Sequence, residues 1–97
     1  MSGYTLTATA EADVLDILQF IAARDGMDRA LHIHDKFVDA FELLSATPFA
    51  GKVRPELTSE HVRWWPVSTF LVVYDAKPTP IDILRVIYGG RDLPSLF

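Results

Sequence analysis

The segment from residue 10 to residue 46 repeats apolar side chains at the helical period and is interrupted only once, at Asp25-Gly26. Glycine takes the left-handed conformation that ends helices at little cost, so we expect one helix to end near Gly26. A second helix is expected from about residue 28 to residue 46, because Pro48 prevents its continuation. Two helices with so short a connection pack antiparallel, as a helical hairpin.

Strand-like segments lie on both sides of this hairpin. The first alternates and is rich in β-formers, and its last residue, Thr9, is placed to cap the first helix. The segment TFLVVYD, residues 69–75, is apolar at both odd and even positions, as in a central strand that is covered on two faces. Residues 49–55 have the composition of a loop. The expected strands are residues 4–9, 62–67, 69–75 and 81–88.

This order, β-α-α-β-β-β, predicts an α+β fold in which the helical hairpin packs on a small, mainly antiparallel sheet. A chain of 97 residues fits a single domain, residues 1–97, and buries only about 60–65% of the surface that it exposes when unfolded. Yet 49% of the residues are hydrophobic. The C-terminal Leu93, Leu96 and Phe97 are the clearest candidates for apolar side chains that the core does not hold. The excess apolar surface predicts a protein partner.

Charge and composition exclude several classes of protein. Residues 1–47 carry eight acidic and three basic side chains, and the sequence pI is about 5.1, which counts against direct DNA or RNA binding. There is no cysteine, hence no disulfide. The N-terminus lacks the pattern of a signal peptide, and no apolar run has the length of a membrane span. We therefore expect a cytoplasmic protein that does not contact a membrane.

No motif indicates a metal or a cofactor. His32 and His34 lie two residues apart on an expected helix, so they point in different directions, and His61 stands alone. The sequence has no nucleophile elbow, phosphate-binding loop or dinucleotide fingerprint. We expect neither a metal nor a cofactor.

Several arginines lie near the ends of the expected strands, with acidic and phenolic side chains nearby. RNA cleavage through the 2′-hydroxyl needs a base, an acid and cations for the phosphorane charge. A simpler interpretation is that Arg85, which has the strand parity of Ile83 and Ile87, pairs with a carboxylate at the rim of the sheet. If the chain is a nuclease, its candidate catalytic residues are Arg63, Arg85, Tyr88 and Glu56.

Two further features suggest contact surfaces. Trp64 and Trp65 are adjacent in a strand and must point to opposite faces, so one belongs to the core and the other is a candidate interface anchor. Gly89-Gly90 lets the chain turn sharply after the last strand. The residues around this turn are candidates for binding a target: Arg85, Tyr88, Arg91, Asp92 and Leu93.

An ordered set of residues spans nearly the whole chain. It consists of Ala10-x-x-Asp13-Val14-x-x-Ile17-x-x-Phe20-Ile21, Leu44-x-x-x-Pro48-x-x-Gly51-x-x-Arg54-Pro-Glu-Leu57, then Arg63, Phe70, Tyr74, and the segment from Ile83 to Asp92. In this order the residues resemble the ParE branch of the RelE/ParE toxins. The resemblance implies the toxin of a type II toxin–antitoxin system, with a fold that agrees with the predicted β-α-α-β-β-β order.

The resemblance also implies partners. ParE-type toxins inhibit DNA gyrase by binding, without catalysis, and form a hetero-oligomer with a ParD-type antitoxin, through which alone they contact DNA. The similar RelE-type toxins are ribosome-dependent mRNA endonucleases but strongly basic, whereas this chain is acidic and has Tyr88 where many relatives have histidine. A nuclease and a non-toxic, antitoxin-binding remnant are the alternatives. We expect the antitoxin to bind across Leu15, Phe20, Val38 and Trp65.

Overall fold

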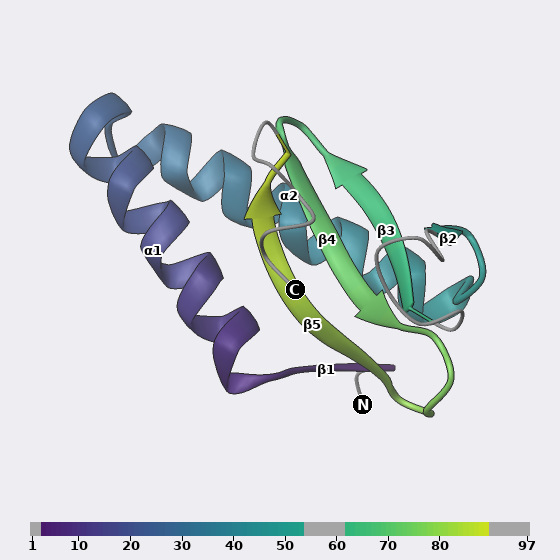
Figure 1. The fold of residues 1–97 in the computed structure, drawn as a ribbon. Coiled ribbons are helices and arrows are strands. Elements are labelled where there is room, and N and C mark those ends of the chain that lie inside the picture. The colour runs from purple at the N-terminus through teal and green to yellow at the C-terminus, as the bar shows by residue number, and fades with distance from the viewer. Residues whose placement is uncertain (1–2, 54–61, 90–97) are drawn as a thin grey trace.

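A computed structural model describes residues 3–53 and 62–89 of the chain. It has the predicted α+β architecture, with two helices that pack on a five-stranded mixed sheet (Figure 1). The elements are β1 (Tyr4–Leu6), α1 (Ala8–Asp25), α2 (Met27–Ala46), β2 (Lys52–Val53), β3 (Val62–Val67), β4 (Phe70–Asp75) and β5 (Ile81–Tyr88).

The ends of the helices follow from local chemistry. Gly26 has φ 96°, ends α1 and begins α2, as the sequence predicted. The N-cap of α1 is Thr7 and not Thr9, because the Thr7 side-chain oxygen accepts the Ala10 N–H at 3.0 Å. Thr9 was therefore assigned wrongly; it lies inside the helix and is exposed. The first strand accordingly ends at Leu6, earlier than predicted.

The strand order is β1-β5-β4-β3-β2, with β1 parallel to β5 and the other pairs antiparallel. The central position of β4 confirms the interpretation of its doubly apolar sequence. The short strand β2, which pairs Lys52 with Trp64, lies in a segment that was predicted to be a loop. Two residues are too few to show a period, so the sequence carried no signal for it.

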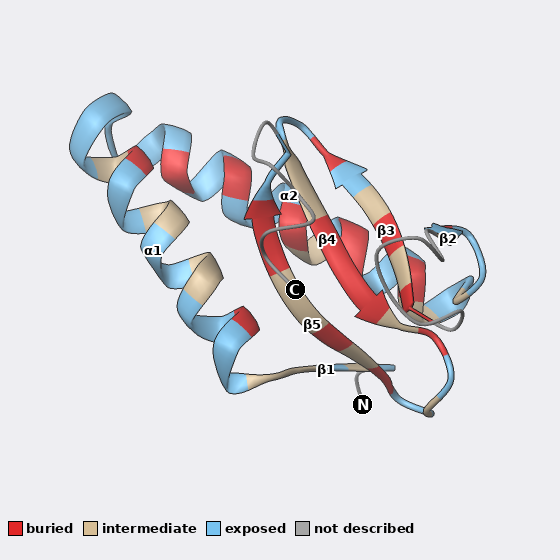
Figure 2. Ribbon diagram, in the orientation of Figure 1, coloured by how far each residue is buried: buried red, intermediate tan, exposed pale blue. Residues whose placement is uncertain are grey.

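The core lies mainly between the sheet and the helices. The buried positions of α2, β4 and β5 are red in Figure 2. Ile33, Phe37 and Phe41 of α2 belong to one cluster with Val72 and Ile83 of the sheet. A second, smaller cluster occupies the opposite face of the sheet and consists of Val62, Trp64, Val73 and Ile87, with Leu71 and Leu84 packed against it. The strand β4 is therefore buried on both faces.

The two tryptophans point to opposite faces, as predicted. Trp64 is 2% exposed and belongs to the smaller cluster, whereas Trp65 is half-buried and packs against the main core. Trp64 is therefore the core residue of the pair.

A bulge in β5 changes the direction of its side chains. Val73 lies opposite Arg85 while Tyr74 lies opposite Ile83, so Leu84 is an extra residue. The predicted common parity of Ile83, Arg85 and Ile87 is therefore wrong: Ile83 belongs to the main core and Ile87 to the smaller cluster.

Candidate functional site

A cleft of about 590 Å³ opens between the helical hairpin and one end of the sheet. It is bordered by the C-terminal half of α1, the start of α2, the β3–β4 turn at Ser68 and Thr69, and the end of β5. Among the described residues, its apolar lining includes Ile17 and Ile21 of α1, Ile33 of α2 and Phe70 of β4.

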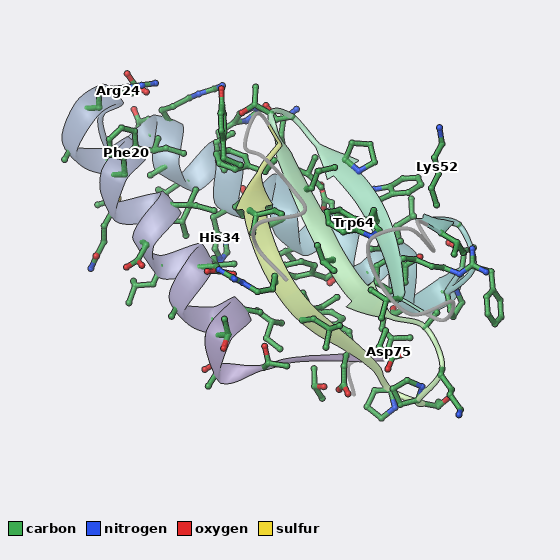
Figure 3. All side chains as sticks on the ribbon, in the orientation of Figure 1. Phe20, Arg24, His34, Lys52, Trp64 and Asp75 are labelled. Carbon is green, nitrogen blue, oxygen red and sulfur yellow. The ribbon has the colours of Figure 1, made fainter. Side chains whose placement is uncertain are left out.

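Two exposed aromatic side chains, Phe20 and Tyr88, also line the cleft, and both are held by neighbours. Phe20 is 62% exposed, and the Arg24 guanidinium lies 5.3 Å from its ring centroid, a cation–π contact at the end of α1 (Figure 3). Tyr88 is 51% exposed, and its ring meets Phe70 edge-on at 6.2 Å. Large, exposed aromatic side chains that neighbouring residues hold in place are typical of protein contact sites.

The charged side chains around the cleft differ in their pairing. Arg24 donates hydrogen bonds to the Asp25 carboxylate from both Nε and Nη2, and the bond from Nη2 measures 3.0 Å. Asp16 and Arg29 also line the cleft, but neither forms an ion pair or side-chain hydrogen bond within the described residues. These two charges are therefore available to a ligand.

Arg85, a candidate for both catalysis and target binding, is engaged inside the protein. Its Nε and Nη2 each donate to a different oxygen of the Asp13 carboxylate, both at 3.0 Å. The Asp13 carboxylate also accepts the backbone N–H of Val86 at 3.1 Å. The hydrogen bonds from Arg85 to the Asp13 carboxylate, together with its negative charge, raise the pKa of Arg85. The ion-pair interpretation of Arg85 is confirmed, and the pair ties α1 to β5.

Arg63 is engaged as well. Its Nη1 donates to the carbonyl oxygens of Gly51 at 2.8 Å and of Phe49 at 3.3 Å, and its guanidinium lies 5.0 Å from the centroid of the Phe49 ring. Beside it, the Tyr74 hydroxyl donates to Pro48 O at 2.7 Å and accepts the Gly51 N–H at 2.9 Å. These contacts hold the segment after α2 against the sheet. Pro48, Gly51, Arg63 and Tyr74, which belong to the family-like pattern, therefore have a structural explanation.

The structure places Arg85 and Tyr88 beside one hollow but keeps Arg63 apart from Tyr88. Arg63 lies opposite Tyr74 and Tyr88 lies opposite Phe70, so the two are separated by four residues along β4, roughly 13 Å. The remaining candidate, Glu56, lies outside the described residues, as do Arg91, Asp92 and Leu93.

The four antitoxin-binding candidates fall at different places. Phe20 lines the cleft, whereas Trp65 lines a separate, shallow hollow between α2 and β3. Leu15 is exposed on α1 and Val38 is half-buried on α2, and neither lines the cleft or the hollow. The sequence analysis grouped Phe20 with Leu15 on one surface and so missed the cleft, because residues five positions apart lie roughly 140° apart around a helix.

Within the two described ranges, no group of three or more histidine, cysteine or acidic side chains is placed to hold a metal ion. His34 has its Nδ1 3.2 Å from an oxygen of Asp35, its neighbour in the chain. None of the described helices is both long and apolar enough to cross a membrane.

The helical hairpin, the five-stranded mixed sheet and the open apolar cleft define a small α+β protein with a surface suited to binding. Residues 4–93 match the family model described as the ParE toxin of the type II toxin–antitoxin system parDE, so the chain belongs to this family. It is also similar to a solved structure described as the chromosomal ParDE TA system from P. aeruginosa. That likeness has a TM-score of 0.76 at 24% identity and covers 91% of this chain and 96% of the other, which shows the shared fold. No curated protein matches in sequence.

Replacing Tyr74 with phenylalanine is expected to lower the free energy of unfolding by about 1–2 kcal/mol, because the Gly51 N–H and Pro48 carbonyl lose a buried partner. Burial raises the pKa of Tyr74, so the unfolded chain loses this proton first and wild-type stability falls as pH rises above about 10. Urea unfolding between neutral and alkaline pH should show a shallower decline for Tyr74→Phe. An equally steep decline would contradict this assignment.

Proposed function

We propose that this chain is a cytoplasmic toxin that inhibits DNA gyrase by binding it, and that a ParD-type antitoxin neutralises it in a hetero-oligomer. The observation that carries the proposal is membership of the ParE family over residues 4–93. The cleft supplies a surface on which such binding can occur, because Phe20 and Tyr88 are exposed there.

Inhibition by binding suits the chemistry of the described residues better than catalysis does. Arg63 and Arg85 are the cations that a nuclease would need, but one bonds to backbone carbonyls and the other to a carboxylate. The protein is also acidic, with a pI of about 5.1, which disfavours the approach of ribosomal RNA. We propose Tyr88 as the principal described contact with gyrase, followed in the chain by Arg91, Asp92 and Leu93.

The test is a supercoiling assay with purified gyrase and the purified chain. The wild-type chain should inhibit supercoiling, and Tyr88→Ala should require a roughly tenfold higher concentration, since truncating a central aromatic contact commonly costs this much. Leu43→Ala is the matched control, because Leu43 is also exposed, at 44%, but lies on α2 outside the cleft. The control should inhibit as the wild type does.

A parallel assay with translating ribosomes separates the alternatives. Intact message together with gyrase inhibition supports the proposal. New mRNA ends with unaffected gyrase would replace it with ribosome-dependent cleavage. If neither assay responds while the antitoxin still binds, the chain is a non-toxic antitoxin-binding remnant.

A further inference from the structure

Tyr88 is the last residue of β5 and is 51% exposed, and side chains this exposed commonly change rotamer on a fast timescale. Directly opposite it on β4 lies Phe70. The two rings meet at an interplanar angle of 73°, with their centroids 6.2 Å apart. An edge-to-face pair at this distance is attractive beyond the apolar area that it buries. Phe70 therefore favours one orientation of the Tyr88 ring.

Phe70 is itself held by the core. It is half-buried and packs against the main cluster, and its ring meets the Phe37 ring edge-on, with centroids 5.6 Å apart. Phe37 is 1% exposed and stacks with Phe41 at 6.4 Å, and Phe41 contacts Tyr4 at 5.4 Å. Interiors are close-packed, so a ring in such a row has little room to move. Phe70 thus connects the exposed ring of Tyr88 to a row of aromatic rings in the core.

The backbone beside this pair is also fixed. The turn between β3 and β4 consists of Ser68 and Thr69, and Ser68 has a left-handed φ of 55°. The Gly89 N–H donates to the Thr69 carbonyl oxygen at 2.8 Å, which ties the end of β5 to this turn. A Cβ on Gly89 would lie 3.1 Å from that oxygen and 3.5 Å from Leu71 Cγ, so the approach is close. Tyr88 therefore stands on backbone that is anchored one residue later.

The Tyr88 hydroxyl plays no part in this arrangement. It forms no hydrogen bond within residues 3–53 and 62–89, so the contact with Phe70 is the aromatic contact that orients the side chain there. The hydroxyl and the free part of the ring are left for a partner. A side chain that is already ordered loses less conformational freedom on binding, which raises affinity without adding a contact.

We propose that Phe70 is a positioning residue for the gyrase contact of Tyr88: it holds the exposed ring in the orientation in which the ring binds. The inference rests on the proposed function, since it specifies how the contact surface of that toxin is organised. Phe70 also lines the cleft, so a direct contact between Phe70 and the target is the alternative that the experiment has to exclude.

The first test is a double-mutant cycle in the gyrase supercoiling assay. Phe70→Leu keeps an apolar side chain but removes the ring, and it should raise the concentration for half-inhibition roughly fivefold. In the Tyr88→Ala background the same substitution should change that concentration by less than about twofold, because the ring that Phe70 orients is absent. An equal loss in both backgrounds would show that Phe70 acts independently of Tyr88 and would overturn the proposal.

The matched control is Phe41→Leu. This is the same replacement in the same row of rings, but Phe37 and Phe70 separate the site from Tyr88. A general loss of core packing therefore affects both variants, whereas only Phe70→Leu should inhibit gyrase less well. Circular dichroism confirms that each variant is folded at the assay temperature.

The second test measures the χ1 angle of Tyr88 by NMR in the absence of gyrase. The three-bond couplings between Hα and the Hβ protons should indicate one dominant rotamer in the wild-type chain and in Phe41→Leu. In Phe70→Leu they should approach the averaged values of a mobile side chain. A loss of stability alone leaves these couplings unchanged in the folded protein. Averaged couplings in the wild type, or a single rotamer in Phe70→Leu, overturn the proposal.

These measurements separate the inference from the proposed function. If the wild-type chain inhibits gyrase but the cycle is additive or the couplings do not respond, the positioning role is overturned and the gyrase target stands. If the wild-type chain leaves gyrase unaffected, the proposed function is overturned whatever the couplings show, and the role of Phe70 in inhibition is overturned with it.

Discussion

Replacing Asp13 with alanine is expected to lower the free energy of unfolding by about 3 kcal/mol, measured by urea denaturation. The Asp13 side chain is 15% exposed and receives three hydrogen bonds, two from Arg85 and one from the Val86 N–H. Its removal leaves a guanidinium that is 30% exposed without its counter-ion and leaves a backbone amide of β5 without its acceptor. The contact between α1 and the outer edge of β5 is therefore weakened.

The matched control is Asp16→Ala. Asp16 lies one turn further along α1, is exposed and has no ion-pair partner among the described residues. Both substitutions gain the same helix propensity, roughly 0.5 kcal/mol, so the difference between the two variants isolates the contacts of Asp13. Equal stability of the two variants would show that the Asp13–Arg85 pair contributes nothing to the fold.

Much of the architecture could be predicted from local patterns. The apolar periodicity located both helices, and Gly26 marked their junction because few other residues tolerate its positive φ. The doubly apolar sequence of β4 indicated a central strand, and the structure confirms it. In each of these cases a single segment carried the whole signal.

The predictions that were wrong concern features that depend on pairing between distant segments. The N-cap moved from Thr9 to Thr7 because the chain leaves the sheet where Thr7 N–H donates to Ile83 O, at 3.0 Å. The predicted common face of Ile83, Arg85 and Ile87 assumed a regular strand, and the bulge at Leu84 moves the residues after it to the other face. Neither event has a signature within its own segment, so periodicity alone was insufficient.

The site was partly predicted for a similar reason. Phe20 and Tyr88 were both named as contact residues, but they were assigned to different partners. The structure shows that they line one cleft, although they are 68 positions apart in the sequence. Their proximity arises from the packing of α1 beside β5, which no sequence spacing encodes.

Replacing Gly51 with alanine is expected to destabilise the protein by about 3 kcal/mol, measured by urea denaturation. A Cβ at this position would lie 2.6 Å from the Tyr74 hydroxyl oxygen, 2.8 Å from Tyr74 Cε1 and 2.9 Å from the Trp64 carbonyl oxygen. The last of these belongs to the backbone of β3 and cannot move away by changing rotamer. The substitution therefore separates the segment after α2 from the sheet and disturbs the carbonyl that Arg63 binds.

A double-mutant cycle with Tyr74→Phe tests this explanation. Phenylalanine removes the closest clashing atom, the hydroxyl oxygen, but leaves Cε1 and the Trp64 carbonyl in place. The double variant should therefore lose less stability than the sum of the two single variants, without returning to the level of Tyr74→Phe. Ala50→Ser is the control, because Ala50 is exposed and adjacent, and it should change stability by less than about 0.5 kcal/mol. Strict additivity would show that the Tyr74 hydroxyl does not limit the space at Gly51.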